Sequence, residues 1–183
     1  MVVELEEFKA VRPLEDVCDR VEIFFRQHSL QACNRKHRHR LADVLVLGSP
    51  VYFHYPTGVY RAFLERLAFP VYSYHYENGQ PLVCRDKVIE TANIFTMNCP
   101  EDMMKNWNYP MFLQANTDTL ATVFGASETL YACNTYQFTD YSRYDITLFS
   151  EEEKRAYRDA HFATDIANAR ALGKRLVEKA QRT

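Results

Sequence analysis

Glycine is scarce in this sequence, the net charge is small, and no long hydrophobic run is present. Only five of the 183 residues are glycine, and the first is Gly48, which excludes a glycine-containing phosphate loop from the part of the chain before it. The formal net charge of -2 gives no general attraction for nucleic acid or an anionic membrane. No apolar run approaches the roughly 18 residues of a membrane-spanning helix, and the N-terminus is acidic where a signal peptide would be basic. We therefore expect a soluble, cytoplasmic protein with no nucleic-acid or membrane partner.

The cysteines do not form the pattern of a metal or iron–sulfur site. Five are present, and no two of them have the C-x-x-C spacing of zinc or iron–sulfur ligands. They are Cys18, Cys33, Cys84, Cys99 and Cys133. An odd number without this spacing indicates free thiols in a reducing compartment, and we expect no metal. The length is that of a single domain, 1–183, that needs no disulfide to be stable.

The most informative stretch runs from Ala42 to Gly58 and reads ADVLVLGSPVYFHYPTG. Its continuous apolar run, Val44 to Leu47, predicts a strand that is buried on both faces. Four ring-bearing residues follow, and Thr57 then provides an N-cap for an amphipathic helix. Open α/β sheets bind their ligands at the carboxyl ends of their strands, so this turn is the predicted site.

Strands and helices alternate along the rest of the chain. We expect a helix from Thr57 to Pro70, a strand over Lys87–Asn98, a helix over Tyr109–Phe124, a strand over Glu128–Asn134, and a last helix with a Ser150–Glu153 capping box. The expected apolar faces are Val59, Phe63 and Leu67 with Tyr60 and Leu64 beside them in the first helix, Phe112, Ala115, Thr119 and Val123 with Leu113 and Leu120 nearby in the second, and Phe162, Ile166, Ala169, Gly173 and Leu176 in the third. This order predicts an α/β protein, a parallel sheet between two helical layers.

Residues 1–40 leave several interpretations open. Val2 to Leu5 and Val21 to Phe25 can each form a strand, and Pro13 also suits the first turn of a helix. The segment Asn34 to Arg40 packs four Arg or Lys residues and two His residues into seven positions. It is interpreted either as a solvated basic loop or as a phosphate-binding segment.

Several separate stretches resemble one family. They read ADVLVLGSPVYF, TGVYRAFLERLAFP, KVIETANIFTMNCPEDM, YACNTYQFTDYSRYD and EEEKRAYRDAHF. Together they resemble the flavodoxin-like NAD(P)H-dependent FMN reductases, in the branch close to iron–sulfur flavoproteins, over residues 41–178. The resemblance implies a three-layer flavodoxin-like sandwich in a homodimer. It also implies electron transfer from NAD(P)H through bound FMN to a quinone, a flavin or another small-molecule acceptor.

The resemblance also implies which residues bind the cofactor. In the family, the loops after two neighbouring strands lie along the isoalloxazine ring of FMN. Here those positions are Ser49, Pro50, Val51, Tyr52, Phe53, Thr57 and Gly58 in the first loop, and Thr96, Met97 and Asn98 in the second. Asn134 to Gln137 follow the last predicted strand at the same end of the sheet. No catalytic side chain is assigned, because a flavin that exchanges protons with solvent needs no side-chain base.

Other residues near this site have simpler interpretations. His54 is expected to be an exposed loop histidine rather than an acid or base, and Cys99 to be buried filler rather than a reactive thiol. Tyr72, Tyr74 and Tyr76 alternate before the turn signal Asn78-Gly79. Tyrosines favour surfaces that are part apolar and part wet, so these three are expected to form a dimer or lid surface.

The sequence departs from the family at its N-terminus. The family begins with a strand and a glycine-containing phosphate loop, and here both are absent or replaced within the atypical segment 1–40. In a flavodoxin-like sheet the loss of this central strand exposes the edge of Val44 to Leu47, which Val2 to Leu5, Val21 to Phe25 or a second subunit can cover. Arg35, Lys36, Arg38 and Arg40 are hypothetical substitutes for the phosphate loop. The alternatives to an enzyme are a truncated, non-catalytic remnant that no longer binds flavin and an FMN carrier without nicotinamide activity.

Overall fold

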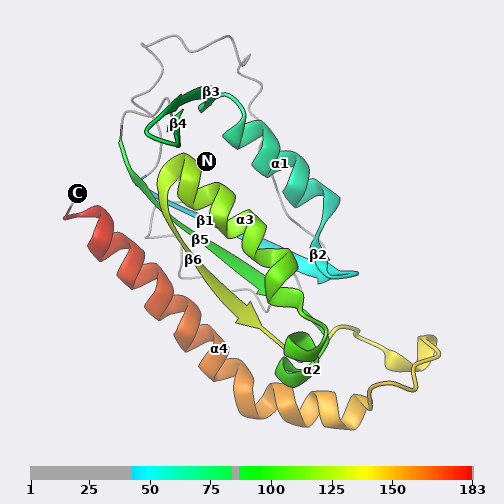
Figure 1. Ribbon diagram of the computed structural model, residues 1–183. Helices are drawn as coiled ribbons and strands as arrows, with labels where there is room; N and C mark the ends of the chain where they lie inside the picture. Colours follow the sequence, from blue (N-terminus) through cyan, green and yellow to red (C-terminus); the bar gives the residue numbers. More distant parts are fainter. Residues whose placement is uncertain (1–42, 84–86, 183) are drawn as a thin grey trace.

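Residues 43–83 and 87–182 are described by the structure, a computed structural model. Along this part of the chain, short strands alternate with helices (Figure 1). The strands are β1 (Val44–Tyr52), β2 (Tyr55–Pro56), β3 (Tyr72–Glu77), β4 (Gln80–Val83), β5 (Ile89–Thr96) and β6 (Gly125–Ala132). The helices are α1 (Gly58–Ala68), α2 (Glu101–Asn106), α3 (Tyr109–Phe124), the short 3-10 helix η4 (Tyr141–Arg143) and α4 (Glu151–Ala180).

The main sheet is mostly parallel and has the strand order β2-β1-β5-β6. β5 pairs in parallel with β1 on one side and with β6 on the other, and only the two-residue β2 is antiparallel. Pro50 lies opposite Thr96, and Thr96 lies opposite Ala132. The three parallel strands therefore end at one common edge, where their following loops meet.

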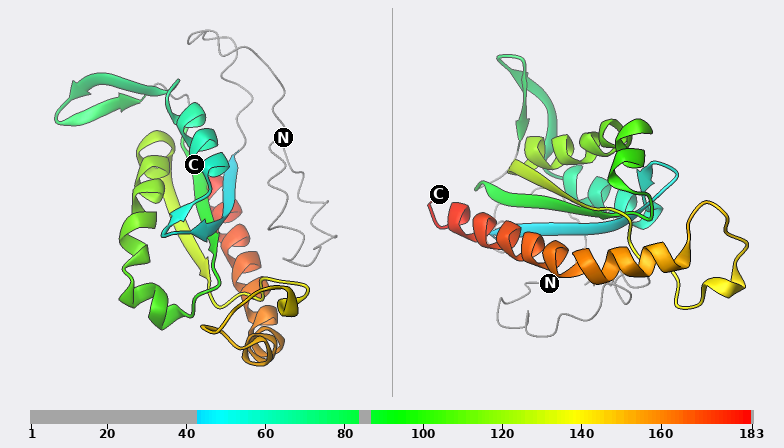
Figure 2. Two further views of the ribbon diagram at one scale, coloured as in Figure 1. Left: turned by 90° about the vertical axis from the view of Figure 1, so that its right-hand side faces the viewer. Right: turned by 90° about the horizontal axis from the view of Figure 1, so that it is seen from below.

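Helices cover both faces of this sheet, as the sequence predicts. Figure 2 shows α1 and α3 on one face and α4 on the other. The larger core lies under α1 and α3 and includes Phe95, Leu64 and Leu113, whereas a smaller cluster of Ala92, Leu172 and Leu176 lies under α4. The α/β class with a central, mainly parallel sheet is therefore confirmed, and its arrangement is compatible with a three-layer sandwich.

Strand β1 differs from the prediction in length and in burial. It extends past the expected end at Leu47 to Tyr52, and Val46 is 41% exposed although the prediction buries both faces. In the described part of the chain, no strand pairs with the outer edge of β1 from Val44 to Pro50. An edge strand tolerates proline and an exposed face, so the edge position explains both differences.

The predicted apolar face of helix α1 is correct in part. Tyr60, Leu64 and Ala68 are buried, whereas Val59 is exposed. The Thr57 side chain caps the helix as predicted by accepting from the Tyr60 amide. The start of the helix is also fixed by a neighbouring element, because the Thr57 amide donates to Ser49 Oγ at 3.0 Å. This tertiary hydrogen bond anchors the first turn and helps to set which residues meet the sheet.

The other predicted stripes are correct in part. In α3, Leu113, Leu120 and Val123 are buried, but Ala115 is exposed and the polar Asn116 and Thr117 are buried in its place. In α4, Leu176 is fully buried, whereas the predicted Phe162, Ile166, Ala169 and Gly173 are half-buried. The fully buried positions there are Lys154, Leu172 and Leu176. In both helices, the buried residues that were not predicted include polar side chains that bond to other elements, namely Asn116, Thr117 and Lys154.

Four polar side chains connect the sheet with the helices above it. Tyr60 donates its hydroxyl to Asn93 Oδ1 at 2.6 Å, and Asn93 Nδ2 donates to Thr117 Oγ1 at 3.1 Å. The Thr117 and Thr129 hydroxyls are 2.6 Å apart. Burial raises the pKa of Tyr60, so its hydroxyl stays protonated as the donor. This network fixes α1 and α3 relative to β5 and β6, which apolar packing alone does not specify.

The tyrosine-rich segment forms a separate hairpin of β3 and β4. Its turn is the predicted Asn78-Gly79 pair, with φ of 52° and 77°, as a two-residue hairpin turn requires. Tyr74 and Tyr76 are exposed, and the hairpin projects from the body (Figure 2). The expected role of these tyrosines as a dimer or lid surface stays a prediction.

Candidate functional site

The loops after β5 and β6 continue the parallel pairing beyond the strands. The Met97 amide donates to the Ala132 carbonyl at 2.9 Å, the Asn134 amide to the Cys99 carbonyl at 2.8 Å, and the Thr135 amide to the Met97 carbonyl at 3.1 Å. The turn from β1 to β2 lies at the same edge of the sheet, because Pro50 is opposite Thr96. The predicted cofactor segments are therefore brought together.

Within the first loop, two predicted residues have their side chains in the protein interior. Ser49 is buried, and its hydroxyl contacts the amide and, at 3.3 Å, the hydroxyl of Thr57. Val51 belongs to the main core. Pro50 is half-buried between them. Only the backbone of Ser49 and Val51 remains for a ligand, so their side chains have a structural role.

The tip of this loop presents its aromatic side chains outward. Tyr52 is 50% exposed and Phe53 is 91% exposed. Phe53 and His54 both have left-handed backbone conformations, with φ of 49° and 75°, which is uncommon for residues other than glycine. The backbone at Gly58 is open as well, because a Cβ atom added to this glycine would have no other atom within 4 Å. The tip therefore offers apolar ring faces next to accessible backbone.

His54 is half-buried and packs in an aromatic cluster, so the expectation of an exposed loop histidine is wrong. Its ring centroid lies 4.5 Å from that of Tyr109 and 5.4 Å from that of Phe112, and Tyr55 contacts Phe112 at 5.3 Å. The left-handed backbone turns the imidazole toward α3. The histidine thereby attaches the loop tip to the helix layer.

The second loop is divided in the same way between buried and accessible groups. Met97 is buried in the main core, and Thr96 is half-buried. Asn98 carries a buried side-chain oxygen, Oδ1, that has no hydrogen-bond partner in the described part of the protein. A buried acceptor without a donor is costly, and since this oxygen is buried, a donor from a ligand reaches it only when the Asn98 side chain turns outward.

Lys154, which the sequence interpretation did not select, lies under both loops. It is only 2% exposed. Its amine donates to the Asn98 carbonyl and, at 2.6 Å, to Asn134 Oδ1. It also lies 4.2 Å from the centroid of the Phe149 ring. Burial lowers the pKa of Lys154 to about 8, because removal from water disfavours the charged form.

A sequence signal for Lys154 exists, although it is weak. Lys154 precedes Leu172 by 18 residues, which is five turns of an α-helix. It therefore lies on the same face of α4 as the buried Leu172 and Leu176. A lysine on the apolar face of a helix indicates a specific partner, but its partners belong to loops that the sequence does not place.

The two described thiols near the site are shielded rather than activated. Cys99 is buried in the core, and Cys133 is half-buried with its sulfur 3.7 Å from that of Met104. Burial raises the pKa of both thiols, that of Cys133 to about 12. Few thiolates are present at neutral pH, so the structure agrees with filler rather than a reactive nucleophile.

A thiol titration checks this shielding. In the variant Cys18→Ser/Cys33→Ser/Cys84→Ser, the two remaining thiols are expected to react with Ellman's reagent roughly 100-fold more slowly in the native state than in urea at the same pH. The comparison of native and unfolded protein is its own control. A thiol that reacts equally fast in both states would contradict the shielded environment.

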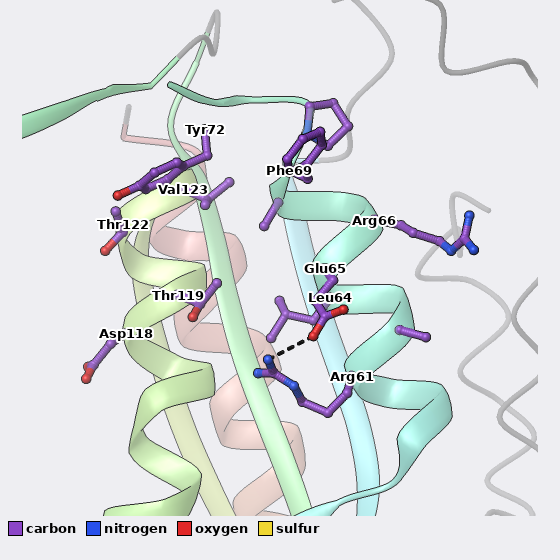
Figure 3. A pocket seen from close by; sticks show the side chains of 13 residues that line it. Arg61, Leu64, Glu65, Arg66, Phe69, Tyr72, Asp118, Thr119, Thr122 and Val123 are labelled. Carbon is purple, nitrogen blue, oxygen red and sulfur yellow. Dashed lines mark hydrogen bonds and ion pairs between the residues drawn. The ribbon is translucent and has the colours of Figure 1, made fainter. Parts of the chain in front are cut away.

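A groove of about 1220 Å³ lies elsewhere, between the C-terminal halves of α1 and α3 (Figure 3). Its lining includes Arg61, which is paired with Glu65 at 3.0 Å, together with Phe69 and Val123. Both helices end near the amino ends of the parallel strands (Figure 1), and α3 leads directly into β6. The groove is therefore away from the predicted cofactor loops, whose position at the strand ends we consider the better indicator of a site.

Comparison with known proteins does not indicate a function for this chain. Neither the scan against protein-family models nor the search among curated proteins gives a match for this chain. Within residues 43–83 and 87–182, no helix has the length and apolar character needed to cross a bilayer. In the same ranges, no group of three or more His, Cys, Asp or Glu side chains is suitably placed to hold a metal ion.

Proposed function

We propose that this protein is a flavodoxin-like, FMN-dependent oxidoreductase that accepts electrons from NAD(P)H and passes them to a small-molecule acceptor, acting as a homodimer in the cytoplasm. The observation that carries the proposal is the common edge of the three parallel strands. There the exposed tip of Tyr52 and Phe53 lies at the same edge as the loop that holds Asn98, whose side-chain oxygen has no partner within residues 43–83 and 87–182. These loops are the ones that the family resemblance assigns to the flavin.

The residues present fit the ring of FMN. Tyr52 and Phe53 supply exposed aromatic faces for stacking. The backbone at Gly58 is open, and Asn98 has a buried acceptor that receives no donor from the residues described. Thr57 and Thr96 are half-buried at the same edge. Stacking faces and a few fixed polar groups are the usual composition of a cofactor site.

The phosphate group of FMN has less support. In the described ranges, the glycines are Gly48, Gly58, Gly79, Gly125 and Gly173. None of them lies in a strand-to-helix loop with the several glycines that hold a phosphate. The hypothetical substitutes Arg35, Lys36, Arg38 and Arg40 lie outside the described residues, as do both candidate strands for the outer edge of β1. The proposal therefore requires that the ring contacts provide most of the affinity.

When bound, FMN supplies the redox chemistry by accepting a hydride and delivering electrons to the acceptor. The chain contributes positioning. The aromatic tip orients the ring face, the loops after β5 and β6 fix its edge, and the buried Ser49–Thr57 contact holds the tip against α1. No side-chain acid or base is required, in agreement with the packed position of His54.

A second candidate function is a non-catalytic α/β domain that no longer binds flavin. It is favoured by the outer edge of β1, which no strand covers in the part of the chain that the structure describes. It is also favoured by the burial of Ser49, Val51 and Met97. These side chains contribute to the fold whether or not a ligand is present.

Titration of FMN fluorescence with purified protein distinguishes the two candidates. Tyr52→Ala and Phe53→Ala are each expected to raise the FMN dissociation constant about tenfold, the value of one aromatic stacking contact. Phe69→Ala is the control, because Phe69 is also exposed but lines the groove away from the predicted cofactor loops. Wild-type protein that leaves FMN fluorescence unchanged would favour the non-catalytic domain.

A further inference from the structure

We propose that Lys154 is the positioning residue of the site, a clamp that fixes the loops after β5 and β6 against each other. This inference rests on the proposed function, because the first of these loops contains the predicted ring contacts Thr96, Met97 and Asn98. Lys154 itself belongs to the first turns of α4, so the clamp joins a third element to the two loops.

The contacts of Lys154 serve the loops rather than an ion pair. Its amine meets one backbone carbonyl, of Asn98, one side-chain oxygen, of Asn134, and the face of Phe149. In the described part of the chain, none of these partners is a carboxylate. A buried charge without an opposite charge costs stability, and an apolar residue of similar size avoids that cost. We therefore infer that the role of this lysine is to hold the two oxygens to which it donates.

The two loops that provide these oxygens are also connected by backbone hydrogen bonds. Asn134 has a left-handed conformation, with φ of 57°, and its amide donates to the Cys99 carbonyl. The Thr135 amide donates to the Met97 carbonyl. Lys154 adds a bond to each side of this ladder, on the Asn98 backbone and on the Asn134 side chain. The two loops are thereby held together as one rigid unit.

The clamp also fixes the residue that carries an unsatisfied acceptor. Lys154 holds Asn98 through its carbonyl, while the side-chain Oδ1 of Asn98 is buried and has no partner among the residues described. Fixing the backbone of Asn98 limits the positions from which its side chain can turn toward a ligand. A preorganised site binds more tightly because less ordering is needed on binding.

The test compares Lys154→Met, Asn134→Gly and the control Lys174→Met, which removes an exposed lysine from the same helix. Amide hydrogen exchange is measured by NMR on protein without flavin. In Lys154→Met the amides of Asn134 and Thr135 are expected to exchange at least about tenfold faster, while that of Ala92 in central β5 is unchanged. The FMN dissociation constant should rise about tenfold.

Asn134→Gly keeps the test valid if Lys154→Met does not fold, because glycine accepts the left-handed backbone while the Oδ1 contact to Lys154 is lost. We expect an intermediate effect on both measurements. Unchanged exchange in both variants would overturn the clamp, and faster exchange with an unchanged FMN dissociation constant would overturn the positioning role. Wild-type protein that binds no FMN would overturn the proposed function, whereas the exchange rates decide the clamp independently of flavin.

Discussion

Asn93→Ala is expected to lower the free energy of unfolding by about 3 kcal/mol, because it removes the centre of a buried polar network. Asn93 is fully buried in β5 and joins the Tyr60 hydroxyl to the Thr117 hydroxyl. Its truncation leaves Tyr60 without its acceptor and leaves a cavity between the sheet and the helices. Urea denaturation followed by circular dichroism measures the change.

Two matched variants separate the network from simple packing. Thr129→Val removes only the terminal contact of the chain and should cost about 1 kcal/mol. Tyr60→Phe combined with Asn93→Ala should cost less than the sum of the single changes, because both remove the same hydrogen bond. A loss below about 1 kcal/mol for Asn93→Ala, or strict additivity of the pair, would contradict the network.

Lys154→Met is expected to change how stability depends on pH. Burial lowers the pKa of Lys154 to about 8, against 10.5 for the free side chain. Between these values the unfolded chain holds the proton more than the folded chain does, so raising the pH favours folding. The stability of wild type minus that of Lys154→Met should rise by about 2 kcal/mol over this window, less than the full shift implies because of solvent screening.

The difference between the two proteins isolates the lysine from other groups. Burial also raises the pKa values of Cys99, Cys133 and Tyr60, which lowers the stability of both proteins as pH rises through the pKa values of the unfolded state. The contributions of Cys133 and Tyr60 cancel in the subtraction. Cys99 interacts electrostatically with Lys154, so the measurement is repeated with Cys99→Ser in both proteins, and Lys174→Met should follow wild type at every pH. Urea midpoints measured from about pH 7 to 10.5 give the curve. A difference that stays constant or falls would contradict the buried position.

Local signals account for the parts of the fold that the sequence predicts. Thr57 and Ser150 cap their helices through contacts three residues away. Asn78-Gly79 and Gly125 mark a turn and a helix end through their own backbone preferences. Each of these features depends on neighbours in sequence, so each is legible without the fold.

The errors arise where a distant element decides. The buried face of α1 is centred on Tyr60 rather than on Val59, and the Tyr60 hydroxyl donates to Asn93 in strand β5. Lys154 is buried because two oxygens far away in the sequence accept hydrogen bonds from it, the Asn98 carbonyl and Asn134 Oδ1. His54 packs inward because its left-handed backbone meets α3. Side-chain periodicity describes one element at a time, and it contains no record of these contacts.

The candidate site shows the same division. The loops at the strand ends follow from the order of strands, and the sequence therefore indicates where a ligand would lie. It does not indicate that Ser49, Val51 and Met97 have buried side chains while Tyr52 and Phe53 are exposed. For the first loop, that distinction depends on where β1 ends, and the apolar run from Val44 to Leu47 does not mark that position. The proposed ring contacts thus reduce to a smaller set of accessible groups.

The most direct test of the proposed function is a visible absorption spectrum of the protein after mixing with FMN and gel filtration, followed by NADPH or NADH in the absence of oxygen. We predict a flavin band that stays with the protein, is weakened in Tyr52→Ala, and bleaches when the nicotinamide is added. A protein that emerges colourless after added FMN would contradict the proposal and establish the non-catalytic domain in its place. Retained colour that neither nicotinamide bleaches would instead indicate an FMN carrier.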